Sequence, residues 1–237
     1  MKNKYFGDIN DYKKYGILRA LTGLGKIQTT VCWILTEDDD SHDGHRISYL
    51  SKPDEWRNHD PEVFDHLQVQ VVKNQKRSVK AIEQTNVLPN CCFYSEILKD
   101  DVETRNQFFK GLLRFAKDSD LIFFDPDNGL EVKSVPLGKK NSSKYLYWEE
   151  VKEAYSAGYS LLIYQHIPRK PRNLFIQQLV AKFRTIVGVQ NVLSFCTSHV
   201  VFFLLPQKNH EEQFRERCSQ ISKTWGSKIA VTQFGEL

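Results

Sequence analysis

The chain has 237 residues, 41% of them hydrophobic and 26% charged, which is typical of a globular protein and unlike disordered or fibrous chains. Its formal net charge of +4 permits an acidic partner such as nucleic acid but does not demand one. No apolar run approaches the roughly 18–20 residues that a membrane helix needs, and the first residues lack the apolar stretch of a signal peptide. We therefore expect a cytoplasmic protein without a membrane partner, whose five cysteines, an odd number without a Cys-x-x-Cys pair, are reduced thiols and not metal ligands.

Strand-like and helix-like stretches alternate along the chain. Asp8 or Asn10 is placed to cap a first helix that carries apolar residues at helical spacing. Further helices are predicted over 61–86, 103–117, 148–157, 174–186 and 211–224, and strands over 29–36, 91–97, 121–125, 159–167, 191–196, 200–205 and 229–234, with a short strand or extended loop at 47–50. The strands at 191–196 and 200–205 are close enough along the chain to form an antiparallel pair. The pattern predicts one α/β domain over residues 1–237, with a three-layer Rossmann-like sheet that is mostly parallel and closed by an antiparallel strand pair.

The stretch with the most chemical information follows the strand predicted at 121–125. Four apolar residues, typical of a buried strand, precede Asp125-Pro126-Asp127-Asn128-Gly129, in which proline and Asn-Gly force a turn. Ligands of open α/β sheets bind beyond the carboxyl ends of the strands. We therefore interpret Asp125 and Asp127 as candidate catalytic carboxylates and Asn128 as a candidate contact to a base, although Asp-Asn-Gly also occurs in ordinary turns.

The strand predicted at 159–167 also ends in polar residues, Gln165 and His166, and a basic segment containing Arg169 follows. If this strand runs parallel to 121–125, a right-handed crossover through the helix at 148–157 brings both carboxyl ends to one sheet edge. Asp125, Asp127 and His166 would then share a cleft, with His166 as an acid/base or electrostatic aid. Gln165 would contact the base and Arg169 the substrate, while a purely structural histidine is the alternative.

Two further segments could hold a nucleic-acid backbone. The predicted first helix interleaves Tyr12 with lysines that include Lys14, which suits stacking on bases and neutralising phosphates, although an amphipathic helix with a charged outer face has the same pattern. The loop-like stretch 131–144 carries Lys139, Lys140 and Lys144 directly after the Asp125 turn. This stretch is either a clamp on the backbone of DNA or RNA, or a disordered insertion.

An acidic run from Glu37 to Asp43 follows the strand predicted at 29–36, with His42 and His45 beside it. A dinucleotide or S-adenosylmethionine site normally has a glycine-rich turn at this point, so we expect no cofactor. The acids and histidines could bind a divalent metal ion, but such a run is more often a solvated loop, and we predict no metal site.

Two resemblances to known families bear on function. Asp125-Pro126 at a strand end resembles the Asp-Pro-Pro-Tyr motif of nucleic-acid adenine N-methyltransferases, and the Gly7-Asp8, Asp11-Tyr12 and Lys14 segment, with the order of the strand-end motifs, resembles the bacterial ribosomal-RNA adenine methyltransferase group. That resemblance implies a Rossmann-like fold and a methyl-donor cofactor, yet Asp127 and Asn128 replace the second proline and the aromatic residue. The Asp-Pro-Asp-Asn-Gly sequence also resembles bacterial DNA glycosylases that attack modified phage bases, which implies a role in antiviral defence.

Four hypotheses follow from these observations. The first is a hydrolase that excises a base, most simply from DNA, because a strand-end carboxylate without a cofactor loop suits glycosidic hydrolysis. The second is an S-adenosylmethionine-dependent nucleic-acid N-methyltransferase with a degenerate cofactor loop. The third is a metal-dependent nuclease that uses the acidic run, and the fourth is a catalytically inactive binding module on the same fold.

Overall fold

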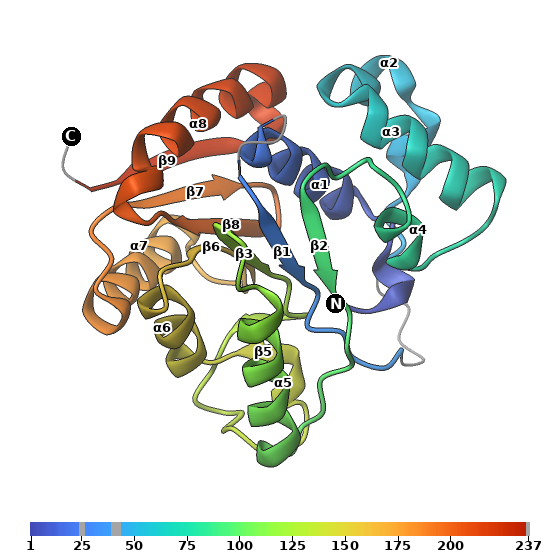
Figure 1. The fold of residues 1–237 in the computed structure, drawn as a ribbon. Coiled ribbons are helices and arrows are strands. Elements are labelled where there is room, and N and C mark those ends of the chain that lie inside the picture. The colour runs from blue at the N-terminus through green and yellow to red at the C-terminus, as the bar shows by residue number, and fades with distance from the viewer. Residues whose placement is uncertain (24–26, 39–43, 236–237) are drawn as a thin grey trace.

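A computed structural model of the chain describes residues 1–23, 27–38 and 44–235. Its centre is a seven-stranded sheet in the order β2-β1-β3-β6-β8-β7-β9 (Figure 1). The strands are β1 (Thr29–Cys32), β2 (Cys91–Tyr94), β3 (Leu121–Phe124), β6 (Ser160–His166), β7 (Val192–Cys196), β8 (Val200–Leu205) and β9 (Ala230–Phe234). The β2, β1, β3 and β6 strands pair in parallel, whereas β8 is antiparallel to both β6 and β7. The predicted mixed α/β fold, mostly parallel with an antiparallel β7–β8 pair, is confirmed.

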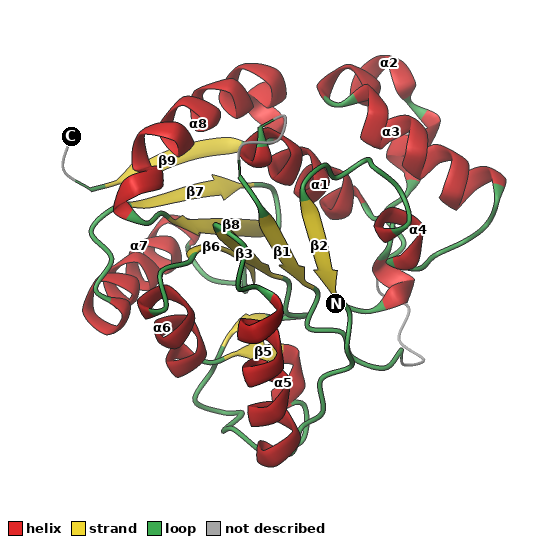
Figure 2. Cartoon of the chain, viewed as in Figure 1, coloured by secondary structure: helices red, strands yellow, loops and turns green. Residues whose placement is uncertain are grey.

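Helices cover both faces of this sheet (Figure 2). They are α1 (Ile9–Thr22), α2 (Pro53–Trp56), α3 (Pro61–Leu67), α4 (Lys80–Glu83), α5 (Val102–Phe115), α6 (Trp148–Ser156), α7 (Arg172–Lys182) and α8 (Glu211–Trp225). Alternate strand residues point to opposite faces. Accordingly Val31 and Phe123 pack in a core with residues of α1, α3 and α8, whereas Cys32 and Phe124 pack in a second core with residues of α5, α6 and α7. These two cores give the three layers that the alternating pattern predicts.

Two predicted elements differ from the structure. Residues 47–50 were expected to be extended, but Ser48–Ser51 form a 3-10 turn that buries Tyr49 and Leu50. The helix expected over 61–86 is interrupted, because α3 continues into a π-helical segment, Gln68–Lys73, and the chain then turns at Gln75 with a φ of 53°. Only the short α4 follows, so a periodic apolar pattern across this region does not require one continuous helix.

A small second sheet extends the turn that follows β3. β4 (Gly129–Leu130) pairs in parallel with β5 (Tyr145–Leu146), and β4 lies close to β6. The buried Arg105 of α5 holds the intervening loop by donating to the carbonyls of Ser142 and Tyr145 at 3.1 and 2.7 Å and by pairing with Glu150. The lysine-rich stretch is therefore packed against α5 and is not the disordered insertion considered from the sequence.

The first helix begins where the sequence predicts. The Asp8 carboxylate accepts a hydrogen bond from the Asn10 amide at 2.9 Å, which satisfies one of the donors left free at a helix start. Gly16 lies against the Trp225 ring of α8, where any added side chain would clash. This close contact fixes α1 across the sheet and brings its amino-terminal turns to the carboxyl ends of β1 and β3.

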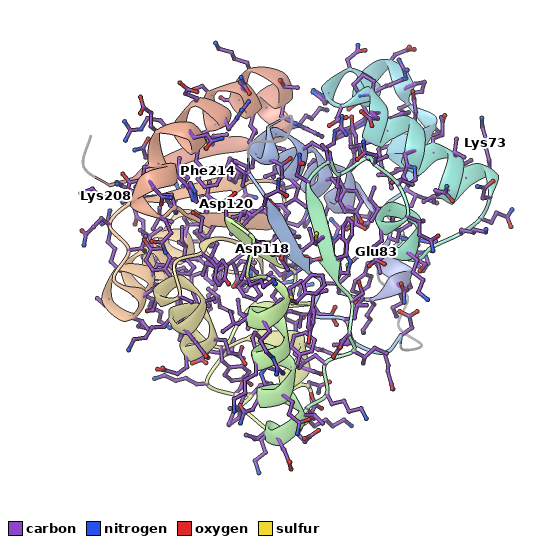
Figure 3. All side chains as sticks on the ribbon, in the orientation of Figure 1. Lys73, Glu83, Asp118, Asp120, Lys208 and Phe214 are labelled. Carbon is purple, nitrogen blue, oxygen red and sulfur yellow. The ribbon has the colours of Figure 1, made fainter. Side chains whose placement is uncertain are left out.

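Different residues lie at the amino ends and at the carboxyl ends of the strands, which form two opposite edges of the sheet. Asp120 precedes β3 at the amino-terminal edge (Figure 3), where its carboxylate accepts a hydrogen bond from the Gln28 amide at 2.9 Å and lies 3.7 Å from His210. The chain start lies at the opposite edge, beside the ends of β1 and β2 (Figure 1). That carboxyl edge holds the site described below.

The remaining predictions from composition concern cysteines and membranes. All five cysteines are free thiols. Among the residues that the structure describes, no helix has both the length and the apolar composition to cross a membrane.

Candidate functional site

A pocket of about 570 Å³ opens at the carboxyl edge of the sheet. That volume lies within the range typical of small-molecule sites, roughly 300–1,000 Å³. The pocket is lined by Met1, Tyr5, Asp8, Asn10, Asp11, Lys14, Gly44, His45, Arg46, Asp125, Pro126, Asp127, Asn128, Tyr164, His166 and His199. Asp125, Asp127 and His166, which the sequence predicts at strand ends, thus lie around one cavity.

Three buried charges form the deepest part of the pocket. The Lys14 ammonium lies 2.7 Å from Asp125 Oδ2 and 2.7 Å from Asp11 Oδ1. Asp11 is further held because its Oδ2 accepts a hydrogen bond from the Gly7 amide at 3.0 Å. Asp125 Oδ1 makes no hydrogen bond to the described part of the chain, so one oxygen of this carboxylate is available to a ligand.

The chain start occupies the crevice between β1 and β3. The Met1 ammonium donates to the carbonyls of Ile34 and Asp125 at 3.0 and 2.9 Å, and it forms a 2.8 Å ion pair with Asp127 Oδ1. The other Asp127 oxygen accepts from the Thr36 hydroxyl at 2.9 Å. Both oxygens of Asp127 therefore have partners within the protein, unlike those of Asp125. We call the network of Met1, Asp11, Lys14, Asp125 and Asp127 the pocket floor.

Burial and pairing act in opposite directions on the floor carboxylates. Burial raises the pKa of Asp11 to about 6, although Lys14 acts to lower it. Burial also acts to raise the pKa of Asp127, but the Met1 ammonium and the Thr36 hydroxyl bring it below its usual value. For Lys14, burial would lower the pKa, and the neighbouring Asp11 and Asp125 raise it. The floor thus holds Lys14 as an ammonium and Asp127 as a carboxylate at neutral pH, whereas the raised pKa of Asp11, about 6, brings its titration near neutrality.

The mouth of the pocket carries a second set of charged groups, which we call the rim: Arg46, His166 and His199. His166 ends β6 and pairs in register with Val200, the neighbour of His199, and the Ile167 amide donates to the His199 carbonyl at 2.9 Å. Arg46 is fixed by its backbone, since its amide donates to Asp8 Oδ2 at 3.1 Å and its carbonyl accepts from the Ile9 amide at 3.0 Å. Burial lowers the pKa of both histidines, and Arg46 lowers it further.

Comparisons with known proteins give limited information. No family model matches the chain, and no curated protein matches it. Among solved structures, the chain is similar to a crystal structure of protein LPL1258 from Legionella pneumophila str. Philadelphia 1, described as a DUF519 protein, with 11% sequence identity, a TM-score of 0.49 and coverage of 97% of both chains.

Several residues that the sequence predicts as substrate contacts have other roles. The buried Tyr12 packs against Tyr49 with ring centroids 5.4 Å apart and donates a hydrogen bond to the Trp56 carbonyl at 2.7 Å, so it presents no ring to a ligand. Gln165 accepts from the Leu130 amide at 2.8 Å and donates to the His166 carbonyl at 2.7 Å, which fixes the turn after β3. Lys14 pairs with carboxylates and not with solvent. Tyr12, Gln165 and Lys14 thus have partners within the protein in this structure, and their contacts with nucleic acid stay predictions.

The other predicted contacts divide between the pocket and the outer surface. Asn128 lines the pocket. Lys139, Lys140 and Arg169 are exposed and are not among the residues that line it. Lys144 is half-buried, and its carbonyl accepts a hydrogen bond from the Asn128 amide at 3.0 Å, so it supports the turn through its backbone.

Four residues of the site escaped prediction from the sequence: Met1, Asp11, Arg46 and His199. Asp11 and Lys14 are three positions apart, a spacing at which helical side chains meet, so their pairing was readable from the sequence. The other three reach the pocket only through tertiary contacts that no local pattern encodes.

The expectations about metals and cofactors concern the segment after β1. Among the described residues no group of three or more His, Cys, Asp or Glu side chains could hold a metal ion. Residues 39–43 of the acidic run, including His42, lie outside the described part of the chain. In place of a glycine-rich turn, Ile34 follows β1 with a φ of 46°, and its carbonyl accepts the Met1 ammonium.

Proposed function

We propose that the protein is a hydrolase that releases a base from nucleic acid, with DNA as its substrate. The observation that carries the proposal is Asp125, a buried carboxylate at a strand end that has one oxygen held by Lys14 and that lines a pocket of about 570 Å³. Enzymes that act on a base extrude it from the stack into such a pocket. The rim supports the same proposal, because its cationic groups are suited to the phosphates on either side of an extruded nucleotide.

In this proposal Asp125 acts at the sugar carbon of the glycosidic bond. Its unpaired Oδ1 would orient a water molecule or stabilise the positive charge that develops as the bond breaks. Water supplies a hydroxyl group to the sugar carbon, and the base departs with the bonding electron pair and takes up a proton. Lys14 is a positioning residue, since it fixes the orientation of Asp125 through the other oxygen.

His166 and Asn128 would act on the departing base. Both line the pocket, one at the end of β6 and one on the turn after β3. Burial and Arg46 lower the pKa of His166, so its ring is mostly neutral at neutral pH and carries one N–H donor. This donor can hydrogen-bond to the base as negative charge develops there, which is the electrostatic one of the two roles, acid/base or electrostatic, considered from the sequence.

The test is a product analysis that separates the four hypotheses. Unmodified DNA, phage DNA with modified bases, and RNA are each incubated with the protein, and the small products are identified by mass spectrometry. The proposal predicts a free base, released without an added cofactor and in the presence of a chelator. Methylated nucleosides that form only with S-adenosylmethionine would show a methyltransferase instead. Chelator-sensitive oligonucleotide fragments would show a nuclease, and binding without any product would show a binding module.

A further inference from the structure

Among the residues that the structure describes, the rim differs from the floor because Arg46, His166 and His199 form no ion pair with a carboxylate. The groups that lower the pKa of His199, after burial, are Arg46, His166, Lys13 and Arg172, and all of them are cationic or can become so. The Asp8 carboxylate, which also lines the pocket, accepts hydrogen bonds from the backbone amides of Asn10 and Arg46 with its two oxygens. The Arg46 guanidinium makes no ion pair with any described residue. Among the described residues the Arg46 charge therefore has no ion-pair partner, and the two rim histidines add positive charge when they are protonated.

The backbone around these groups is held in place. Arg172 of α7 donates to the Ser198 carbonyl at 2.6 Å, which fixes the turn between β7 and β8 that carries His199. On the opposite side, Arg77 donates to the Phe6 carbonyl at 2.9 Å and to the carbonyl of Gly44, and its guanidinium meets His45 Nδ1 at 2.9 Å. The segment carrying Arg46 is thus anchored to both α1 and Arg77. The backbone positions of Arg46 and His199 at the pocket mouth are thus fixed before an anion binds, which reduces the conformational entropy that binding costs.

We infer that Arg46 and His199 bind a backbone phosphate beside the nucleotide whose base enters the pocket. The inference rests on the proposed function for the identity of the polymer, and it adds the substrate feature that positions the base. Arg46 supplies a permanent charge with several N–H donors, which matches phosphate oxygens. His199 supplies an imidazole that is more strongly attracted when protonated, so the phosphate favours its protonated form.

The inference predicts a pH dependence of binding. Burial and the surrounding Arg46, His166, Lys13 and Arg172 lower the pKa of free His199, so the ring is mostly neutral at neutral pH. A bound phosphodiester, which keeps its negative charge, raises that pKa, so binding takes up a proton and strengthens as the pH falls. His199→Asn should reduce this dependence, and the fraction that remains belongs to His166.

The experiment measures binding of a short single-stranded oligodeoxynucleotide by fluorescence anisotropy. The Arg46→Ala/His199→Asn variant should bind about tenfold more weakly and flatten the salt dependence, because each phosphate contact contributes a slope of about 0.7 for a single strand. The matched control is Arg215→Ala on α8, which also removes a surface cation but lines a different cavity. Thermal unfolding checks that both variants fold, as expected for exposed side chains.

A second arm locates the phosphate. Single phosphates of the oligonucleotide are replaced one at a time by neutral methylphosphonates. One replacement should weaken binding to the wild-type protein and leave binding to the Arg46→Ala/His199→Asn variant unchanged. Equal losses for both proteins at every position, or a variant that binds like Arg215→Ala, would overturn the inference. Arg46-dependent binding of nucleoside monophosphates but not of oligonucleotides would also overturn it, by assigning the site to a free nucleotide.

These outcomes are independent of base release. Binding is measured without turnover, so the phosphate contact is supported even if no base is released, and the proposed hydrolase is then the part that fails. Conversely, base release with unchanged binding of the variant leaves the hydrolase in place and removes the phosphate contact.

Discussion

The floor and the rim of the pocket differ in whether their charged groups are paired within the protein. In the floor, Lys14 and the Met1 ammonium are shared among Asp11, Asp125 and Asp127, and each of these carboxylates lies within 2.8 Å of a cation. In the rim, Arg46 is positively charged, His166 and His199 become so when protonated, and none of the three forms an ion pair with another described residue. Buried charges must be paired within the fold, whereas exposed charges are solvated by water and can bind a ligand of opposite charge. The floor is thus suited to chemistry and the rim to binding.

The largest effect on stability is expected from removing the Lys14 ammonium from the floor. Lys14→Met leaves Asp11 and Asp125 buried beside each other without their shared ammonium. Breaking a buried ion pair from one side typically costs about 3–5 kcal/mol of unfolding free energy. Urea denaturation should show this loss, and the additional change Asp125→Asn should recover part of it. A loss below about 1 kcal/mol would mean that the floor charges are solvated and not coupled.

The second prediction compares the two carboxylates of the turn after β3. Asp125→Asn should lower single-turnover base release by a factor of hundreds, roughly the scale for losing an acid/base or electrostatic group. Asp127→Asn should act less on the rate and more on stability, because both Asp127 oxygens bind groups of the protein. Rates are measured at saturating protein. If Asp127→Asn has the larger effect on the rate, the assignment of Asp125 is reversed.

A third prediction concerns the pH dependence of stability. Folding raises the pKa of Asp11 from 3.8 to about 6, so the folded state favours the protonated acid. The resulting stabilisation is complete below pH 3.8 and is lost as the pH rises through about 6. Relative to wild type, Asp11→Asn should therefore gain on the order of 3 kcal/mol between pH 4 and pH 7. Denaturant unfolding of both proteins across this range measures the difference, and a constant difference would contradict the raised pKa.

The smallest effect is expected from the lysines outside the pocket. Replacing Lys139, Lys140 and Lys144 together by alanine should weaken DNA binding and flatten its salt dependence, because phosphate neutralisation is additive and independent of sequence. The loss should be smaller than that of the rim variant, since Lys139 and Lys140 are exposed and do not line the pocket. Single-turnover base release at saturating protein should be unchanged. A larger loss than in the rim variant would move the principal DNA contact to the 131–144 loop.

Sequence patterns predicted the parts of the fold that burial alone determines. The apolar runs of β1, β3 and β6 are buried on both faces, so their composition identifies them. Parallel pairing then places Asp125 and His166 at one edge without further information. The interruption after α3 was not predictable in this way, because a positive φ at Gln75 depends on what packs around it.

The chemistry of the site was less predictable than its location. Tyr12, Gln165 and Lys14 have residue types suited to ligands, but each has a partner inside the fold. The Tyr12 hydroxyl donates to a backbone carbonyl, Gln165 accepts from the amide of a turn residue, and Lys14 pairs with two carboxylates. Arg46 and His199 have no distinguishing local pattern. They meet only because the loop before α2 packs on α1 and because β8 pairs with β6. Residue type thus indicated where chemistry is concentrated, and tertiary packing decided which side chains remain available.

The division between floor and rim is tested most directly by measuring affinity and single-turnover base release on one DNA substrate for two variants. Asp125→Asn should retain its affinity and lose the rate, because the proposed mechanism uses the Asp125 carboxylate at the reacting sugar and not in holding the backbone. Arg46→Ala/His199→Asn should lose affinity and retain the rate at saturating protein, because it alters only the hold on the backbone. Losses of rate and affinity together in both variants, or an unchanged rate in Asp125→Asn, would contradict this account of the site.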